Sequence, residues 1–239
     1  MTILSQISDP DVLSFLTHII QTTNSEALFV SALEAISYFG SPGISLFVNT
    51  LITHPTSSLF DKFSNTLLKH KKEISHVILE TLQQTDEARV LLPLFQLIKS
   101  LQLKEAEPFI IQKGLSSHDS SLKQLAILIL GQLKAKKAIP ALLQELVKAD
   151  LNSLPVLLQT LGEIADPQIL PALDPFKNHE NENIRCLVIW ALSQTAHVDV
   201  FPYLLECLQD PSLAVQQAGI KGMGCIESPE VIPLLLELI

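Results

Sequence analysis

Apolar residues recur along the chain at the spacing of one face of a helix. In the segment 119–133 they fall three and four residues apart, at Leu122, Leu125, Ala126, Ile129 and Leu133. This period of about 3.6 residues predicts an amphipathic helix that buries one stripe. Similar stripes follow one another throughout the chain, with short polar turns between them. The pattern therefore predicts an all-α fold.

The helices recur with a period of about 31 residues. A proline inside an apolar block marks the period, at Pro108, Pro140, Pro171, Pro202 and Pro233. The same register continues towards the N-terminus through apolar stretches centred on Val77, Leu46 and Ser14. Proline is well tolerated in the first turn of a helix, because its missing N–H has no intrahelical partner there. Each proline is thus expected at the start of the second helix of a helical hairpin.

A second landmark, such as Leu161-Gly162 or Leu192-Ser193, precedes each proline block and indicates where the first helix ends. We expect first helices near residues 25–39, 57–69, 86–101, 119–133, 153–163, 181–194 and 212–224. We expect second helices near residues 11–21, 43–53, 73–84, 105–115, 137–148, 167–176, 198–209 and 229–239.

Several short motifs predict helix ends. An Asp-Pro pair places a capping side chain before a proline at the first helical position, as in Asp9-Pro10, Asp166-Pro167 and Asp210-Pro211. Thr23 and Glu26 have the spacing of a capping box. Pro175 falls inside an expected second helix, so we expect that helix to be shortened, with a local change in superhelical curvature. The polar segment 177–183 that follows is either a binding feature or a tolerated irregularity.

The pattern resembles the HEAT repeat, and in particular its short bacterial form first associated with phycobilin lyases. Residues 161–173 and 210–233 carry the resemblance, which is strong from about residue 118 and weaker, though in register, before it. HEAT repeats of this form usually carry a basic residue in the first helix, and here Arg185 alone occupies that position. The resemblance implies a right-handed α-α superhelix, a HEAT-like solenoid of about seven helical hairpins plus an N-terminal half-repeat, forming one domain over residues 1–239.

In this family the second helices line a concave face that binds partner proteins. The corresponding solvent-side positions here are His18, Thr50, Thr81, Gln112, Gln144, Pro175, Glu206 and Glu237. The row passes from neutral to acidic along the chain. It is either a docking groove whose C-terminal half prefers basic or polar partners, or an ordinary solvated face. Gln112, Gln144, Glu206 and Glu237 are our candidate contact residues.

Lysines gather in three successive turns between paired helices, at Lys69, Lys71, Lys72, Lys104, Lys134, Lys136 and Lys137. The matching turns further on carry Glu163, Asp166, Asp199, Glu227 and Glu230. A basic edge of this kind is suited to gripping an acidic partner or a membrane surface. The alternative is that the lysines are solvated and favour the nearby helix C-termini.

Composition and charge exclude several classes of function. The formal net charge is −9, and Arg89 and Arg185 are the only arginines, which argues against nucleic-acid binding. The start of the chain lacks the pattern of a signal peptide, and the longest apolar runs are too short to insert in a membrane. Cys186, Cys207 and Cys225 are odd in number and lack metal-type spacing, which favours a reducing, cytoplasmic location.

No catalytic, cofactor or metal motif was found, and Trp190 is expected in the core. The leading hypothesis is a non-catalytic scaffold or adaptor that binds another protein through its concave face or lysine edge. The alternative is an enzyme-associated HEAT-like module, such as a bilin-lyase-type subunit or the regulatory arm of a larger enzyme. The apolar run 234–239 ends the chain without a cap. It suggests a piece of a longer protein, or self-association through this last helix. The alternative is a terminal helix that packs on its own neighbour.

Overall fold

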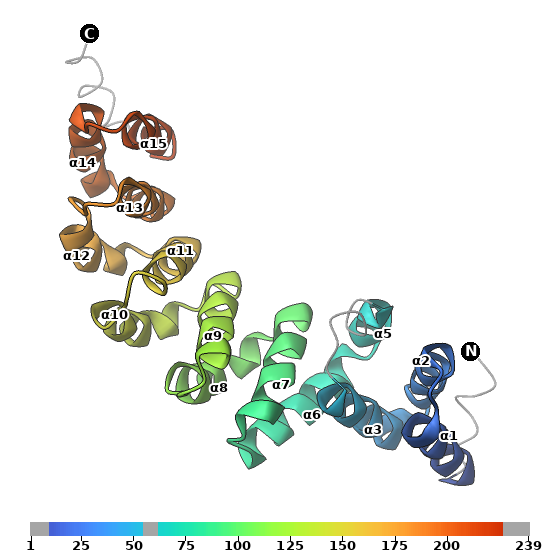
Figure 1. Cartoon of the computed structure of the whole chain (residues 1–239). Coiled ribbons are helices and arrows are strands. Elements are labelled where there is room, and N and C mark those ends of the chain that lie inside the picture. The colour runs from blue at the N-terminus through green and yellow to red at the C-terminus, as the bar shows by residue number, and fades with distance from the viewer. Residues whose placement is uncertain (1–9, 55–61, 227–239) are drawn as a thin grey trace. The chain divides into compact units, whose positions relative to one another are not determined.

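The computed structural model describes residues 10–54 and 62–226 (Figure 1). Every regular element in these two ranges is helical, which confirms the predicted all-α class. The chain divides into two compact units, residues 1–109 (unit 1) and residues 110–239 (unit 2). A single repeat domain over residues 1–239 stays a prediction.

Unit 1 contains first and second helices in the predicted alternation. The first helices are α2 (Glu26–Ile36), α5 (Ser64–Lys69) and α7 (Ala88–Leu101). The second helices are α1 (Pro10–Thr22), α3 (Gly40–Thr53), α6 (Lys71–Gln84) and, after the 3-10 turn η2 (Lys104–Ala106), the short α8 (Glu107–Phe109). Helix α2 packs against α1 and α3, and α3 packs against α6 and α7. The core includes Phe47, whose ring meets Phe63 edge-on at a centroid distance of 5.2 Å.

Unit 2 begins with the π-helical segment η3 (Ile110–Leu115). Its first helices are α9 (Ser120–Gln132), α11 (Leu154–Ile164), α13 (Glu182–Gln194) and α15 (Leu213–Met223). Its second helices are α10 (Ile139–Val147), α12 (Leu170–Leu173) and α14 (Phe201–Glu206). Short 3-10 turns flank them, namely η4 (Lys136–Ala138), η5 (Pro167–Ile169), η6 (Asp174–Phe176), η7 (Val198–Val200) and η8 (Cys207–Gln209).

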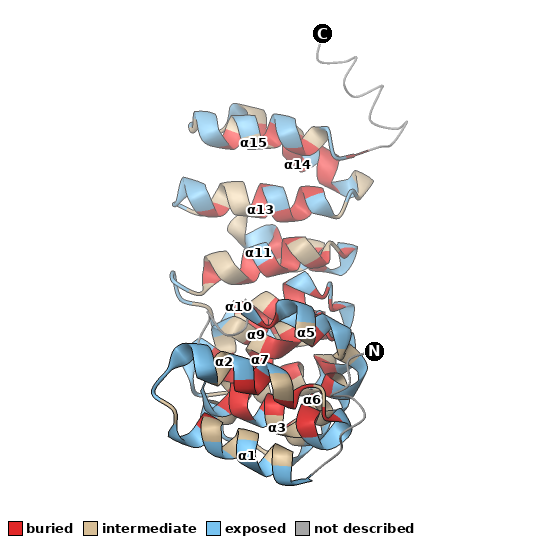
Figure 2. Ribbon diagram, turned by 90° about the vertical axis from the view of Figure 1, so that its right-hand side faces the viewer, coloured by how far each residue is buried: buried red, intermediate tan, exposed pale blue. Residues whose placement is uncertain are grey.

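The first helices of unit 2 form one layer and its second helices form another (Figure 1). Helix α11 packs between α9 and α13, and α13 packs between α11 and α15. The buried residues lie on the facing sides of these helices (Figure 2). This arrangement follows from the apolar stripes, because one hairpin alone cannot bury its stripe and must stack on its neighbours.

Small residues allow the first helices to approach one another closely. A Cβ added to Gly162 on α11 would lie 2.9 Å from the Cα atom of Ala191 on α13 and 2.3 Å from the Trp190 ring. The same contact recurs in register along the layer, as Gly131 against Thr160, Gly162 against Ala191 and Ser193 against Gly222. The predicted Leu-Gly and Leu-Ser landmarks are therefore packing positions as well as helix ends.

A left-handed residue terminates successive first helices. Gln102, Lys134, Ala165 and Ala196 have φ values of 50°, 53°, 56° and 50°. None is a glycine, although this conformation costs other residues roughly 1 kcal/mol or more. Each is followed by a 3-10 turn and then by the second helix, where Pro140, Pro171 and Pro202 occupy the predicted early positions.

The predicted helices are present wherever the structure describes them. Helix α12 is only 4 residues long and passes into the 3-10 turn η6 at Asp174, which confirms the predicted shortening before Pro175. The change in curvature stays a prediction. The expected helix 229–239, the early part of 57–69 and the Asp9 cap lie outside the described residues.

Three local predictions were wrong. Ser25, rather than Thr23, is the N-cap of α2, because its hydroxyl accepts from the backbone N–H of Leu28. Pro211 does not begin a helix, since α15 starts at Leu213. Trp190 is 37% exposed rather than buried in the core, although its ring contacts Gly162 of the neighbouring helix. The Asp166 cap is confirmed, since its carboxylate accepts from the N–H of Gln168 at 3.1 Å.

Candidate partner-binding site

The predicted row on the second helices is exposed only in part. Gln112, Gln144 and Glu206 in unit 2 are exposed, as are His18 and Pro175. Thr50 is buried, which contradicts the prediction, because its hydroxyl donates to the carbonyl of Leu46 at 2.8 Å and turns into the helix. Thr81 is half-buried and donates to the carbonyl of Val77 in the same way. Glu237 lies outside the described residues.

The predicted edge lysines of unit 2, Lys134, Lys136 and Lys137, are exposed, but Lys136 already has a partner. Its Nζ atom lies 3.1 Å from Oδ2 of Asp166, in the next turn of the layer. The backbone N–H of Gln168, and then Lys136, lower the pKa of Asp166 below its usual range. Asp166 is therefore engaged in joining adjacent repeats and does not offer a free acidic edge. Lys134 and Lys137 are exposed beside this contact.

The lysines of unit 1 surround the turn between α5 and α6. A single residue, His70, separates Lys69 at the end of α5 from Lys71 at the start of α6. Position 71 is in register with Gln102 and with Gly40, both of which have positive φ, yet no positive φ occurs at this turn. This turn therefore departs from the repeated backbone pattern among the turns that the structure describes.

A cleft of about 710 Å³ lies beside this turn. Leu68 of α5, Lys71, Lys72, His76 and Leu79 of α6, and Glu105 of η2 are among its lining residues. The side chain of Leu68 is 60% exposed although it is a large apolar residue. Lys104, between two lining residues, is exposed on the neighbouring turn. The cleft thus combines apolar surface with a concentration of lysines.

Lys69, Lys71 and Lys72 supply positive charge along the cleft, and His70 lies in the turn between them. Burial, and then the charge of Lys69, lower the pKa of His70 below its usual value, which favours a neutral ring. The Nε2 atom of His70 is buried and has no hydrogen-bond partner among the described residues. Lys69 lies over the ring of Tyr38, 4.7 Å from its centroid. Lys71 and Lys72 form no ion pair with any residue that the structure describes.

A smaller hollow of about 320 Å³ lies on the other side of α6. Ser41, Ile44 and Ser45 of α3 line one wall, and Val77 and Glu80 of α6 line the other. Lys72, Glu73 and His76 line both hollows. The two hollows therefore flank α6 between Lys71 and Glu80.

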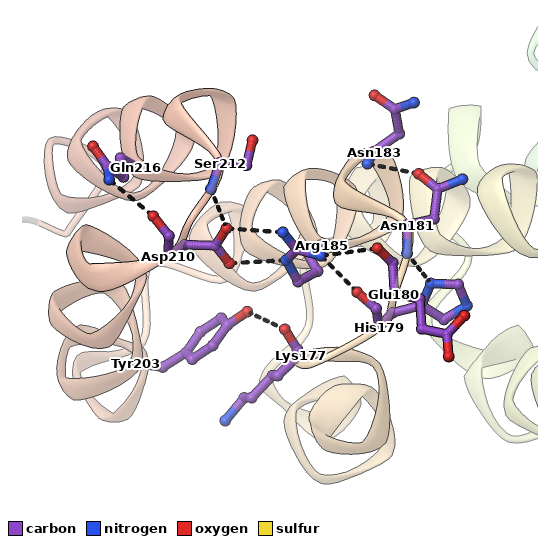
Figure 3. Close-up of polar contacts among 10 residues, drawn as sticks. All are labelled: Lys177, His179, Glu180, Asn181, Asn183, Arg185, Tyr203, Asp210, Ser212 and Gln216. Carbon is purple, nitrogen blue, oxygen red and sulfur yellow. Dashed lines mark hydrogen bonds and ion pairs between the residues drawn. The ribbon is translucent and has the colours of Figure 1, made fainter.

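A polar cluster of unit 2 centres on Arg185 (Figure 3). Its Nε and Nη2 atoms each donate to the carboxylate of Asp210 at 2.8 Å, and Nη1 donates to the carbonyl oxygens of His179 and Glu180 at 2.7 and 3.2 Å. The Arg185 and Asp210 side chains are only 12% and 14% exposed. Asp210 also accepts from the N–H of Ser212 at 2.8 Å, and so holds the start of α15.

This cluster fixes the polar segment 177–183. Asn181 caps α13 through the N–H of Asn183, and Nδ1 of His179 accepts from the N–H of Asn181 at 3.0 Å. The Tyr203 hydroxyl donates to the carbonyl of Lys177 at 3.4 Å, and burial raises the pKa of that phenol so that it stays a donor. The segment is a structural junction, and Arg185 does not have a free guanidinium with which to bind a ligand.

Sequence reasoning identified Lys71 and Lys72 from their charge, but missed both the cleft and the role of Asp210. The sequence singled out Arg185 as a basic residue of the first helix, but it did not indicate that Arg185 pairs with Asp210. The two residues are 25 positions apart, so no local pattern connects them. In the described part of the chain, no group of three or more His, Cys, Asp or Glu side chains is arranged to hold a metal ion. None of the described helices combines the length and apolarity needed to span a membrane.

Known proteins share sequence or structural similarity with parts of this chain. A family model described as HEAT repeats matches residues 156–212 and 169–239. The fold is similar to that of a crystallised engineered protein, with a TM-score of 0.51 and 17% identity over 94% of this chain and 73% of that chain. A second engineered protein gives a TM-score of 0.42 and 15% identity over 92% of this chain and 97% of that chain.

Importin beta gives a TM-score of 0.46 and 14% identity, with 93% of this chain aligned to 36% of importin beta. No curated protein matches the chain by sequence. The family match lies within unit 2, whose first and second helices form two layers. Residues 156–239 therefore match HEAT repeats.

Proposed function

We propose that this chain is a non-catalytic scaffold that holds an acidic segment of another protein in the cleft beside α6. HEAT-repeat solenoids commonly serve as scaffolds for protein interactions. The observation that carries the proposal is the pairing of Lys71 and Lys72, which have no described ion-pair partner, with the exposed side chain of Leu68 in one cleft.

The energetics favour a segment that combines charge with apolar side chains. An exposed ion pair contributes only about 0.2–1 kcal/mol, so two lysines alone give weak binding. Burying an exposed leucine contributes about 1.5–3 kcal/mol more. Lysine carries a compact charge on a flexible stem, so it accepts carboxylates in several geometries. The cleft is therefore suited to an acidic peptide segment with apolar residues next to the charge.

The test uses the full chain and peptides selected on it from a random display library. We expect the selected peptides to be acidic, and the K71E/K72E variant to bind them at least tenfold more weakly in fluorescence anisotropy. The matched control is K134E/K137E, which makes the same change of net charge at exposed lysines of unit 2. We expect the control to stay within about twofold of the wild type. Equal losses in both variants, or selected peptides without acidic residues, would refute the proposal.

A further inference from the structure

The two hollows beside α6 are adjacent and share lining residues, which suggests that they act together. The smaller one lies between α3 and α6, and the larger one lies between α6 and the turn that carries Leu103 and Glu105. Lys72, His76 and Glu80 are spaced four residues apart on α6, so they form one ridge between the hollows. A ligand that fills both hollows has to cross this ridge.

The size of the ridge selects the conformation of such a ligand. A helix with its side chains is about 10–12 Å across, and an extended chain advances about 3.3 Å per residue. Two side chains four residues apart on one face of an extended segment are therefore about 13 Å apart, which is enough to straddle α6. Neighbours two residues apart are about 7 Å apart and do not reach across it.

The charges along the ridge fix where an acidic side chain is accepted. Lys71 and Lys72 lie at the N-terminal end of α6 with Glu73 beside them, and Glu80 lies further along the helix. Glu105 lies on the far wall of the larger hollow. An acidic side chain is attracted near Lys71 and Lys72, which outnumber Glu73, and it is repelled near Glu80 and Glu105, because like charges disfavour each other at short range. The acidic position of the ligand therefore lies over the ridge, between the hollows.

We infer that the partner segment is extended and crosses α6, with an acidic residue beside Lys72 and an apolar side chain on each side of it. One apolar side chain occupies the hollow lined by Ile44 and Val77, and the other, four residues away, occupies the hollow lined by Leu68 and Leu79. This inference rests on the proposed function, because it names the kind of segment that the same cleft binds.

The experiment fills the smaller hollow and leaves the lysines untouched. Ser41 is exposed and Ser45 is half-buried, and both line that hollow. We expect S41W and S45W each to weaken binding of the selected peptides about tenfold, while S121W, at an exposed serine of α9, leaves the dissociation constant within twofold. Circular dichroism verifies that each variant is folded, and S41W is informative even if S45W fails to fold.

The peptide supplies a second test. Inserting one residue between its two apolar positions turns one of them to the opposite face of an extended chain, so we expect the affinity to fall about tenfold. If K71E/K72E abolishes binding while S41W, S45W and the insertion have no effect, the crossing of α6 is refuted and the proposed function stands. If K71E/K72E has no effect either, both the inference and the proposed function fail.

Discussion

Unit 2 and the α5–α6 region of unit 1 show the same repeat with different degrees of regularity. In unit 2, a left-handed residue and a 3-10 turn follow α9, α11 and α13, and small residues bring these first helices close together. Between α5 and α6 a single residue makes the turn, and the cleft with its lysines lies beside it. The comparison suggests that regular repeats provide stability, and that a departure from the register provides a surface for binding.

The largest difference between the two units is expected when each arginine is replaced in turn. We expect R185M to lower the free energy of unfolding of unit 2 by about 3 kcal/mol, because it leaves the largely buried carboxylate of Asp210 without its partner. The matched control is R89M, since Arg89 pairs with Glu87 in unit 1 but is 83% exposed, and we expect a change below about 1 kcal/mol. Hydrogen exchange resolved along the chain, during urea titration, measures both units. Equal effects would contradict the assignment of stability to the Arg185 junction.

The close contacts between first helices predict the next largest effect. We expect G162A to destabilise unit 2 by about 2 kcal/mol, because its methyl group would overlap the Trp190 ring and approach the backbone at Ala191. G224A is the control, since a Cβ there meets only the carbonyl of Lys221 at 3.4 Å. Thermal unfolding followed by Trp190 fluorescence measures the difference. A loss of stability in G224A as large as that in G162A would show that helix spacing is not the cause.

Acid should weaken unit 2 through Asp210, with a smaller effect than either substitution. Hydrogen bonding to Arg185 lowers the pKa of Asp210 in the folded chain. The stabilisation is therefore complete above the unfolded carboxyl pKa of about 3.9 and is lost as the pH falls below it. We expect the difference in unfolding free energy between the wild type and D210N to shrink from pH 6 to pH 3. A difference that stays constant over this range would contradict the role of the Asp210 charge.

The smallest difference between the units is expected when a helix cap is removed from each. The carboxylate of Asp119 accepts from the N–H of Leu122 at 3.0 Å in unit 2, whereas the hydroxyl of Ser25 accepts from the N–H of Leu28 at 3.5 Å in unit 1. We expect D119A to cost about 1 kcal/mol and S25A about half of that, because the longer contact is at the limit of a hydrogen bond. Hydrogen exchange in the first turns of α9 and α2 reports each loss locally. The reverse order would show that these distances do not set the strength of the caps.

The helical register was predictable from sequence because apolar spacing and proline positions are local signals. The left-handed turns were missed, since Lys134 and Ala165 are residue types that do not favour positive φ. The Arg185–Asp210 junction depends on the stacking of two helices, so it cannot be predicted from either residue alone. Lys71 and Lys72 were found by their charge, but the cleft beside them results from the packing of α6 against its neighbours.

The left-handed turns also bear on how such a chain diverges and grows. Because a backbone torsion rather than a residue type marks the turn, substitutions there can accumulate without altering the length of the unit. The turns at Gln102 and Lys134 lie before the residues matched by the family model, yet they have the same conformation as those at Ala165 and Ala196. A duplication or deletion that joins two such positions would add or remove one whole unit and restore the same backbone at the junction.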